Sequence, residues 1–356
     1  MSGVIMFKED RLLDLVQVTI LVISMTPAAA FAAQRTFVST TGSDANLCTR
    51  SAPCRSFGAA SLLTDAGGEI VVLDSGGYGA VTIDRSVALI APSGVHAAVS
   101  VFTGHGITIS AGASDVVVVR GLYLTGLGGS RGISFDTGGV LHVENCVVSG
   151  FTGSGIFGGA DPGSVYVKDS ISRNNLEGFR FQSTSDIEAN LDSVRAEENS
   201  DAGVAAYEGS VVTVTRSVAA GNGAGANFYA GASGILNVED CTAVYAFYGV
   251  YASAGTVRVS RSMITGNTNG VVAGAGANTI SFGNNRVDGN GTNGTFTTTV
   301  TECIPEPVSV TCSSYTKFCP RVVLVNNCGE PVPCGENCGP GQICCVDLCW
   351  SGPACP

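Results

Sequence analysis

The sequence predicts an all-β solenoid, a parallel β-helix in which short strands wind around one core. Two observations predict this fold: an internal repeat of 21 to 25 residues and a composition suited to strands and corners. Of the 356 residues 48 are Gly and 12 are Pro, which disfavours helix bundles. The chain is 45% hydrophobic and only 13% charged, which excludes a disordered chain.

The repeat is anchored on an apolar residue that precedes two turn residues and a small residue. Successive anchors are 24, 24, 23, 24, 21 and 23 residues apart, at Val143, Val167, Leu191, Val214, Val238, Val259 and Phe282. Eight residues beyond the anchor, five of the seven repeats have Asn, at Asn175, Asn199, Asn222, Asn267 and Asn290. A Gly before an apolar residue follows, at Gly155, Gly178, Gly203, Gly225, Gly249 and Gly270.

Each repeat is expected to form one coil of the solenoid. Gly and Asn tolerate the left-handed backbone that sharp corners require. Stacked coils place each strand about 4.8 Å from its copy in the next coil, in parallel register. We expect the Asn column to form a ladder of amides that hydrogen-bond from coil to coil. Leucine-rich repeats share the period but need a different Leu and Asn spacing, and propeller blades are about twice as long.

Residues 1–33 predict a secretory signal. Lys8 and Arg11 precede an apolar run from Leu12 to Met25 and an Ala-rich stretch. This order is typical of a signal peptide, and the run is too short and too interrupted to span a membrane. We therefore expect an exported protein, extracellular or periplasmic, with no membrane insertion after the signal is removed.

Fourteen cysteines support export. Ten of them lie in the last 54 residues and predict a disulfide module over residues 301–356. These ten are Cys303, Cys312, Cys319, Cys328, Cys334, Cys338, Cys344, Cys345, Cys349 and Cys355. The module has no His, which disfavours a metal site there. Cys146 and Cys241 share an inward column but lie four coils, about 19 Å, apart. That is too far for a disulfide, so we expect two free, buried thiols.

Two N-terminal stretches and the coils resemble a known group of proteins. The stretches are residues 46–57, NLCTRSAPCRSF, and residues 66–79, AGGEIVVLDSGGYG, and the coils continue to about Asn290. Together they resemble the bacterial secreted right-handed parallel β-helix repeat proteins of the pectin-lyase-like superfamily. The resemblance implies that Cys48 and Cys54 close a small loop. The Cys-rich tail is not part of the pattern.

The resemblance also implies a domain organisation. The right-handed β-helix would cover residues 66–300, and a cap over residues 34–65 would precede it. In that cap, residues 56–65 would form a short amphipathic helix that closes the open end of the coils. Residues 67–68 would then turn into the first strand.

The superfamily includes polysaccharide lyases, polygalacturonases and noncatalytic or adhesive surface proteins, so the fold alone does not show which of these functions the chain has. Polygalacturonase-like hydrolases carry four motifs, of which this chain has only Gly104-His105-Gly106, expected to be a turn with an exposed His. A pectate-lyase-like site needs Ca²⁺ held by carboxylates beside an Arg or Lys base. The candidate catalytic residues are the acidic pairs Glu197, Glu198, Glu239 and Asp240.

The acidic pairs also suit a structural interpretation, because charges at the corners alternate in sign from coil to coil. One series is Glu144, Lys168 and Asp192, and another is Arg216, Asp240 and Arg261. At one-coil spacing we expect ion pairs between coils. This interpretation needs no metal or cofactor, and Ca²⁺ is expected only if the protein is a lyase.

The expected binding residues are aromatic. Tyr245, Tyr248 and Tyr251 form a cluster with Phe247 and with Phe228 and Tyr229 one coil earlier, and the outward rings would stack on sugars. We therefore expect a secreted, noncatalytic surface or scaffold protein that binds carbohydrate or a cell surface. The alternative is a polysaccharide lyase or glycoside hydrolase that acts on acidic polysaccharide through a divergent carboxylate or Ca²⁺ site. In a third interpretation, the tail carries the function. A net charge of −11 argues against a nucleic-acid partner.

Overall fold

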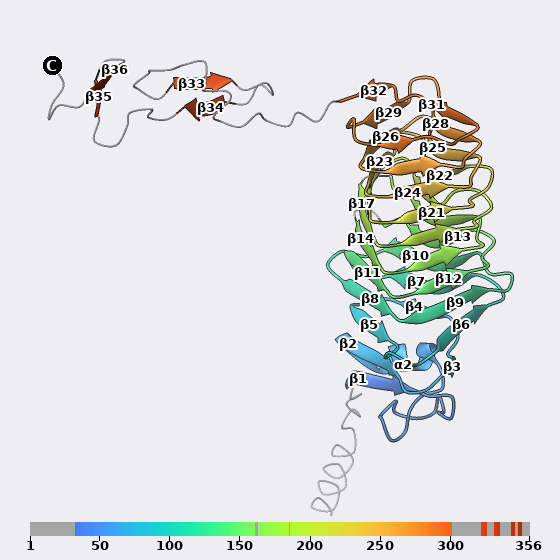
Figure 1. Cartoon of the computed structure of the whole chain (residues 1–356). Helices are drawn as coiled ribbons and strands as arrows, with labels where there is room; N and C mark the ends of the chain where they lie inside the picture. Colours follow the sequence, from blue (N-terminus) through green and yellow to red (C-terminus); the bar gives the residue numbers. More distant parts are fainter. Residues whose placement is uncertain are drawn as a thin grey trace, which may run out of the picture.

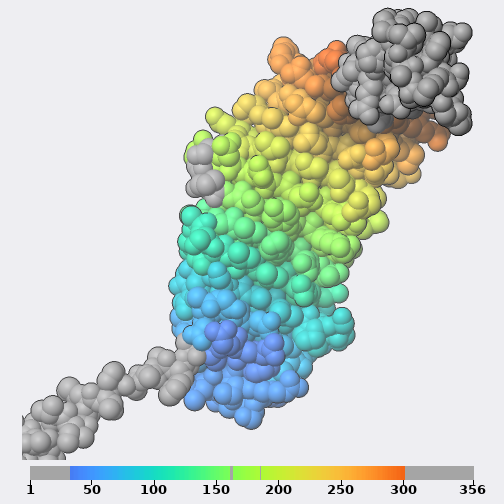
Figure 2. Space-filling view, turned by 90° about the vertical axis from the view of Figure 1, so that its left-hand side faces the viewer, coloured from blue at the N-terminus to red at the C-terminus, as the bar shows by residue number. Residues whose placement is uncertain are grey.

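The computed structural model describes residues 33–160, 163–184 and 186–300, with four short strands of the tail. The chain is a right-handed parallel β-helix, as predicted (Figure 1). Its coils stack in sequence order into one elongated column (Figure 2). No helix in this described part is long and apolar enough to cross a membrane. The predicted signal, apart from Ala33, and the side chains of the ten tail cysteines lie outside the described residues.

Three parallel sheets, named A, B and C, run along the column. Sheet A contains β1 (Ala33–Val38), β2 (Thr64–Val72), β5 (Val87–Ile90), β8 (Val116–Arg120), β11 (Val140–Glu144), β14 (Gly163–Lys168), β17 (Ile187–Asp192), β20 (Ser210–Thr215), β23 (Ile235–Glu239), β26 (Thr256–Ser260), β29 (Asn278–Ser281) and β32 (Thr298–Thr299). Sheet B contains β3 (Gly76–Gly77), β6 (Ala97–Val101), β9 (Leu122–Gly126), β12 (Val147–Ser149), β15 (Ile171–Arg173), β18 (Arg195–Glu197), β21 (Val218–Ala220), β24 (Thr242–Val244), β27 (Met263–Thr265) and β30 (Arg286–Val287).

Sheet C contains β4 (Val81–Ile83), β7 (His105–Ser110), β10 (Arg131–Thr137), β13 (Ser154–Gly158), β16 (Glu177–Phe181), β19 (Val204–Ala206), β22 (Ala226–Ala230), β25 (Tyr248–Ala252), β28 (Asn269–Ala273) and β31 (Thr292–Gly294). In the tail, β33 (Val322–Val325) pairs with β34 (Pro331–Cys334), and β35 (Ile343–Cys345) pairs with β36 (Leu348–Trp350), both antiparallel.

Side chains alternate between the inside and the outside of the column, as the period of a strand requires. In β16, Phe179 and Phe181 are buried, whereas Arg180 between them is half-buried on the outer face. Large apolar side chains such as Phe135 and Phe228 fill the interior. Burying one such side chain is worth about 1.5 to 3 kcal/mol, so the coils are held together mainly by this shared core.

Residues with left-handed backbone turn the chain at two corners of each coil. At the corner between sheets A and B, the residues with φ of +44° to +56° are Asn145, Asp169, Ser193, Arg216, Asp240 and Arg261. At the corner between sheets B and C, those with positive φ are Gly79, Gly104, Gly128, Gly150, Asn174, Glu198, Gly221, Tyr245, Gly266 and Gly289. The sequence predicts Gly and Asn at corners, and the structure adds residues with larger side chains. Stacking of the coils must hold these residues in a conformation that L-residues disfavour.

The Asn column forms the predicted ladder inside the corner between sheets B and C. Asn175 Nδ2 donates to Asn199 Oδ1 at 3.2 Å, and Asn199 Nδ2 donates to Asn222 Oδ1 at 2.9 Å. The same Oδ1 atoms accept the backbone N–H of the ladder residue one coil earlier. A Cβ on Gly203 would lie 2.7 Å from Asn222 Nδ2. The Asn ladder therefore needs the Gly column beside it, which explains why both recur at fixed spacing.

One coil is out of register with the sequence alignment. The alignment places Gly225 in the column of Gly203, but Val204 pairs with Phe228, so Asn227 occupies that place. The backbone O of Asn227 would lie 2.6 Å from a Cβ on Gly203, which confirms the register. The interpretation of Gly225 as the corner Gly is therefore wrong.

Asn227 has a structural reason to replace Gly. The next coil has Ala246 in the ladder column, where an amide is missing. Asn227 fills the gap, because its Oδ1 accepts from Asn222 Nδ2 at 2.7 Å and its Nδ2 donates to Asn267 Oδ1 at 3.1 Å. The chain of side-chain amides thus continues past the coil that lacks its own Asn.

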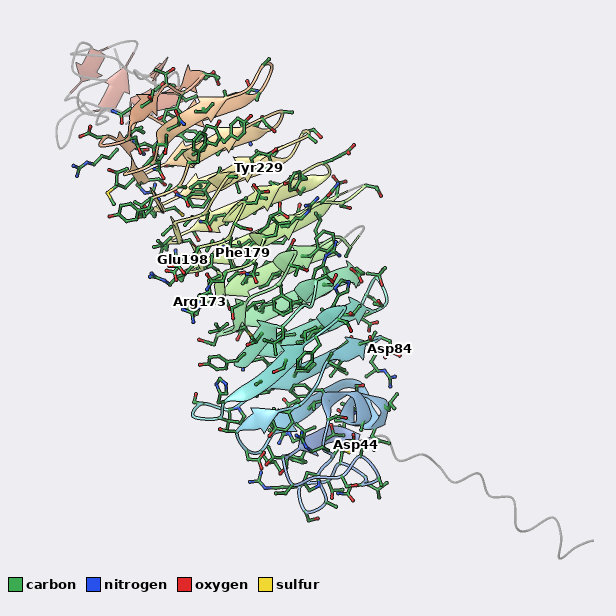
Figure 3. The ribbon with its side chains drawn as sticks, turned by 90° about the vertical axis from the view of Figure 1, so that its right-hand side faces the viewer. Asp44, Asp84, Arg173, Phe179, Glu198 and Tyr229 are labelled. Carbon is green, nitrogen blue, oxygen red and sulfur yellow. A yellow bond between two sulfur atoms is a disulfide. The ribbon has the colours of Figure 1, made fainter. Side chains whose placement is uncertain are left out.

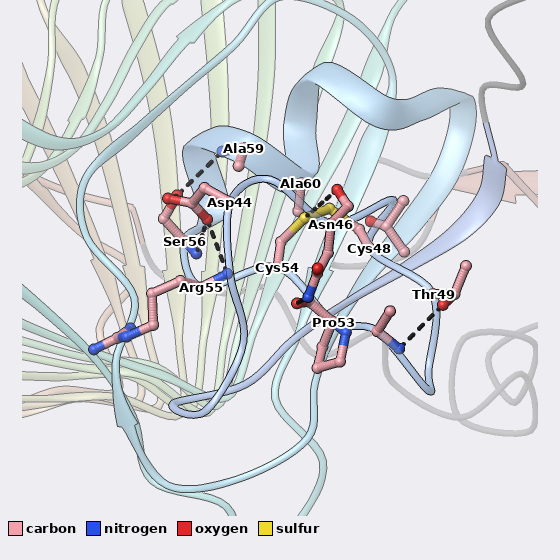
Figure 4. The surroundings of a disulfide bond; sticks show 12 residues. Asp44, Asn46, Cys48, Thr49, Pro53, Cys54, Arg55, Ser56, Ala59 and Ala60 are labelled. Atoms are coloured by element: carbon pink, nitrogen blue, oxygen red, sulfur yellow. Dashed lines mark hydrogen bonds between the residues drawn. A yellow bond between two sulfur atoms is a disulfide. The ribbon is translucent and has the colours of Figure 1, made fainter.

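The helix α2 (Phe57–Leu63) closes the N-terminal end, within the range predicted for it. The side chain of Ser56 accepts the N–H of Ala59 at 3.2 Å and caps the helix. The carboxylate of Asp44 accepts bonds from the N–H and the hydroxyl of Ser56, each at 2.9 Å (Figure 4). Beside the helix, Cys48 and Cys54 form a buried disulfide with Cα atoms 4.6 Å apart.

The first strand begins earlier in the chain than expected. Residues 33–38 already form strand β1 of sheet A, within the segment expected to be only a cap. Gly67 and Gly68 lie inside β2 and do not precede the first strand. Gly67 has φ +79°, and the pairing of β1 with β2 shifts register beside it. The two glycines therefore form a bulge within a strand, which a Gly-Gly pair in the sequence does not distinguish from a turn.

Candidate binding groove on sheet A

A groove runs along the outer face of sheet A, on the side of the column turned toward the viewer in Figure 2. It consists of three hollows of about 270, 290 and 300 Å³. The first two share Glu188 as a lining residue, and the last two share Thr213. The three hollows therefore adjoin one another in a row parallel to the axis of the column.

The floor of this groove is a column of outward side chains, one from each coil. The column reads His142, Tyr166, Asn190, Thr213, Asn237 and Arg258, and its members from Tyr166 to Arg258 line the second and third hollows. Since the strands are in register, neighbours are about 4.8 Å apart and the column is about 24 Å long. The ring of Tyr166 is 45% exposed and stacks on His142 at 5.1 Å.

Polar contacts order the other end of the floor. Asn237 Nδ2 donates to Thr213 Oγ1 at 3.3 Å, and Asn237 Oδ1 accepts from Arg258 at 3.3 Å. The floor therefore offers an aromatic ring, amides, a hydroxyl and a guanidinium along one line. Such groups suit an extended ligand rich in hydroxyls, which needs both stacking and hydrogen bonds.

A larger hollow of about 450 Å³ lies at the corner between sheets A and B. It is lined by residues 90–95, Arg120, Gly121, Tyr123 and Asn145, and it shares no lining residue with the groove. Tyr123 there is 39% exposed and lies 4.2 Å from the ring of His96. This second Tyr–His pair has the same two ring types as the Tyr166–His142 pair, but its rings are tilted by 42° and it lies outside the groove.

The candidate acids Glu239 and Asp240 lie at the end of β23, beside the groove, and Arg261 of the next coil pairs with both. Arg261 Nε donates to Asp240 Oδ1 at 2.9 Å, and this bond lowers the pKa of Asp240. The two carboxylates in turn raise the pKa of Arg261. An Asp held ionised by a guanidinium is a poor proton donor at neutral pH.

Two further ion pairs also join an acid of one coil to an arginine of a neighbouring coil. Asp192 pairs with Arg216 of the next coil, a contact between the two predicted series, whereas the pair of Asp240 with Arg261 lies within one series, as predicted. Glu144 pairs with Arg120 of the preceding coil at 2.7 Å, a residue that the predicted series did not include. The arginine side chains are about half exposed or more and the acids are partly exposed, so such pairs contribute little to stability and mainly keep the charges of the corners balanced.

The other candidate acids, Glu197 and Glu198, lie two coils earlier at a different corner, between sheets B and C. Glu197 Oε1 accepts from Arg195 Nε at 2.6 Å. Glu198 is exposed and has φ +52°, and Figure 3 shows it on the same edge of the column as Arg173. The structure therefore does not bring the four candidate acids together.

These residues do not fit a Ca²⁺ site. Ca²⁺ takes six to eight oxygen ligands, whereas the two acidic pairs lie at different corners, and three of the four acids are bonded to arginines. Within residues 33–160, 163–184 and 186–300, no group of three or more His, Cys, Asp or Glu side chains is placed to hold a metal ion.

The candidate aromatic residues fall into two places. Tyr248 and Tyr251 lie on the outer face of β25, with rings stacked at 4.6 Å, and Tyr229 lies 5.7 Å from Tyr251. Tyr229 belongs to a coil nearer the C-terminal end than Glu198 (Figure 3). Phe228 is buried in the core, as alternation requires. Tyr245 instead occupies the corner before β25.

Sheet C also carries a buried charged network that the sequence analysis missed. Glu177 is 1% exposed, and its carboxylate accepts bonds from Arg180 at 2.9 Å, from the Tyr207 hydroxyl at 2.8 Å and from Ser154 at 3.3 Å. Arg180 lies over the Tyr207 ring at 4.4 Å. Burial and then Glu177 raise the pKa of Asp201 nearby. The Glu177 carboxylate holds its neighbours in place, because its donors all come from the protein.

His105 corrects one expectation. It begins strand β7 and is half-buried, whereas Gly104, with φ +69°, makes the turn. Its Nδ1 lies 3.0 Å from the hydroxyl of Ser130. Burial and then the charge of Arg131 lower the pKa of His105. The prediction of an exposed turn was wrong because the turn ends one residue earlier.

Cys146 and Cys241 are free and buried. Their thiols donate to the backbone carbonyls of Glu144 and Glu239, at 3.3 and 3.1 Å. Burial raises the pKa of each thiol to about 11. At neutral pH both are therefore protonated and unreactive.

Comparison with known proteins gives the same fold. A family model described as right handed beta helix region matches residues 89–257. The crystal structure of pectate lyase Pel9A is similar at 18% sequence identity and a TM-score of 0.47, over 69% of this chain and 74% of that chain. No curated protein matches the chain. The family model describes a fold and names no substrate or reaction.

The groove could have been found from the sequence. Its floor consists of the residues immediately before the repeat anchors, from His142 before Val143 to Arg258 before Val259. Reading that column would have shown a ring, amides and a guanidinium in line. The network around Glu177 gives a weaker signal, because a charged residue beside a corner Gly is also typical of a solvated surface.

Proposed function

We propose that the protein is an exported β-helix that binds an extended polysaccharide or cell-surface glycan along sheet A without cleaving it. The observation that carries the proposal is the row of adjoining hollows on sheet A, two of which are lined by one outward side chain per coil from Tyr166 to Arg258. A polymer that repeats along its length suits this floor, because contacts recur about every 4.8 Å. Export rests on the predicted signal and on the Cys-rich segment 301–356.

The state of the acids supports binding over cleavage. Glycoside hydrolysis uses two carboxyl groups on opposite sides of the bond, one of them protonated. Beside the groove, Glu239 and Asp240 both face Arg261, which keeps Asp240 ionised. Cleavage of an acidic polysaccharide would need a proton donor or a base that is free of such a partner.

Affinity electrophoresis of the full chain through gels that contain neutral or acidic polysaccharides tests the proposal. We expect retardation by at least one polymer and about two- to tenfold weaker retardation for Tyr166→Ala, because one ring contact is worth about 0.5 to 1.5 kcal/mol. Asn237→Ala should weaken it as well. Tyr123→Ala is the matched control, since it removes a similar ring that also lies beside a His but outside the groove. Equal effects of Tyr166→Ala and Tyr123→Ala, or no retardation at all, would reject the groove as the binding site.

A further inference from the structure

Backbone strain and exposure coincide at Tyr245. This residue has φ +58° and is 74% exposed. In the coils before and after it, the same position is Gly221 and Gly266, which adopt positive φ without penalty. A Tyr there costs free energy and gains little burial in return. Strained residues that persist in this way cluster at functional sites.

Tyr245 lies at the corner immediately before a group of outward rings on and beside β25. Phe247 is 47% exposed and meets the ring of Tyr248 edge-on at 4.6 Å, and Tyr248 stacks on Tyr251. The ring of Tyr245 lies over Gly266, where a Cβ would come within 3.0 Å of its Cε1. The glycine therefore leaves room for the ring, and grouped exposed rings of this kind mark interaction sites.

The strand residues in register beside these rings are uncharged, and at the same corner the carboxylates of Glu198 and Asp288 lie two coils away on either side. Asn269 follows Tyr248 in register on the next strand of sheet C, and Val272 follows Tyr251. The carboxyl and guanidinium groups of sheet C lie in earlier coils, around Glu177. A ligand for this surface therefore needs an apolar face and neutral hydrogen-bonding groups, with no net charge.

We infer that Tyr245, Phe247 and Tyr248 form a stacking site for a ring of an uncharged saccharide. A pyranose ring has an apolar C–H face and a rim of hydroxyls, which match the aromatic faces and the Asn269 amide beside them. Since a coil has three sides, the corner between sheets B and C lies opposite sheet A. The site is therefore separate from the groove, and it does not depend on the proposed function of the groove.

The test is a titration of the full chain with neutral hexasaccharides of glucose, xylose and mannose, followed by saturation-transfer NMR. Tyr245→Gly removes the ring and relieves the strain, so the variant should keep an unchanged or higher Tm. We expect about tenfold weaker binding for Tyr245→Gly and for Phe247→Ala. Phe102→Ala is the matched control, because Phe102 is 67% exposed at the same corner between sheets B and C but lies six coils before Tyr245, after β6.

Four outcomes would overturn the inference. They are no binding of any neutral hexasaccharide, equal binding by Tyr245→Gly, a lower Tm of Tyr245→Gly, and a dimer of the wild-type chain that Tyr245→Gly abolishes. The third would show that the ring supports the fold, and the fourth would show that a second copy of the chain occupies the site. Tyr166→Ala should retain hexasaccharide binding here, which separates failure of this site from failure of the groove.

Discussion

Inside the corner between sheets B and C, successive coils repeat one another, and on the outside of the same corner they differ. The inner side carries the Asn ladder against the Gly column, with hydrogen bonds of 2.9 to 3.2 Å between consecutive amides. The outer side carries Gly221 and Gly266 in two coils but Glu198 and Tyr245 in others, at the same left-handed position. On its inner side this turn is constrained by the hydrogen bonds of the ladder, whereas on its outer side the residue type varies from coil to coil.

The difference teaches how to separate structure from function in a solenoid. Where every coil needs the same contact, a departure must be compensated nearby, as Asn227 compensates for Ala246. Where a departure has no compensation and adds strain, as at Tyr245, a role outside the fold is the better explanation. The groove on sheet A follows the same rule, because its floor changes chemistry from coil to coil while the strands beneath it stay in register.

The largest loss of stability is expected from a substitution in the Asn ladder, on the inner side of the corner. Asn199→Ala leaves the buried backbone N–H of Asn175 without its acceptor, removes one of the acceptors of Asn175 Nδ2 and removes the bond to Asn222. We expect a loss of about 2 to 4 kcal/mol in the free energy of unfolding, measured with denaturant. Asn278→Ala, at an exposed position on sheet A, is the control and should change it by less than about 0.5 kcal/mol. Equal, small losses in both variants would show that the ladder does not stabilise the column.

A smaller loss of stability is expected at Asn227, and it tests whether this residue compensates for Ala246. Asn227→Gly removes the amide that links Asn222 to Asn267, and we expect a loss of about 1 to 3 kcal/mol. Adding Ala246→Asn returns an amide to the ladder column of the next coil, so the double variant should recover most of that loss. A double-mutant cycle in chemical denaturation measures the coupling. Additive losses would contradict the role assigned to Asn227.

The contribution of the N-terminal cap to thermal stability should fall in acid. Burial opposes ionisation of Asp74, but bonds from Tyr78, Thr40 and Ser39 outweigh it and lower the pKa of Asp74 to about 2. Because this pKa lies below its value in the unfolded chain, the bonds stabilise the fold above about pH 4, and the benefit is lost as the pH falls toward 2. The Tm advantage of the wild type over Asp74→Asn should therefore shrink between pH 5 and pH 2. An advantage that stays constant over this range would refute the assignment.

The smallest effect concerns the outer side. Glu198→Gly gives the left-handed position a residue that accepts it, so we expect a gain of up to about 1 kcal/mol. Glu198→Ala is the matched control, because it removes the same charge but keeps the strain, and it should give no gain. Equal thermal stability of the two variants would show that strain at this corner is negligible.

The repeat made most of the fold predictable from the sequence. The anchors mark the strands of sheet A, and the spaced Asn and Gly columns follow from one interlocking contact between Asn199, Asn222 and Gly203. The prediction failed where a coil is longer, since Asn227 lies two residues beyond the Gly chosen by spacing. It also missed β1. Residues 33–38 form a strand because they pair with β2, which is distant in sequence, and the local preference of these residues for strand is too weak to show this.

The candidate sites were less predictable. Spacing shows which residues share a column, but it does not show whether a carboxylate is taken by an arginine, as Asp240 is by Arg261. Burial of a charge such as Glu177 depends on side chains from three different coils, Ser154, Arg180 and Tyr207. Those contacts appear only when the coils are stacked. The groove floor was readable from the sequence, yet its depth comes from flanking side chains of both neighbouring columns.

The central claim is that the groove binds an extended glycan and leaves it intact. The most direct measurement is the length distribution and end chemistry of the bound polysaccharide, recovered after long incubation with the full chain, with and without Ca²⁺. We predict retention on the protein with no new reducing ends and no unsaturated products in either condition. Shortened chains or unsaturated ends, above all if they depend on Ca²⁺, would contradict the account and show that the protein cleaves its ligand.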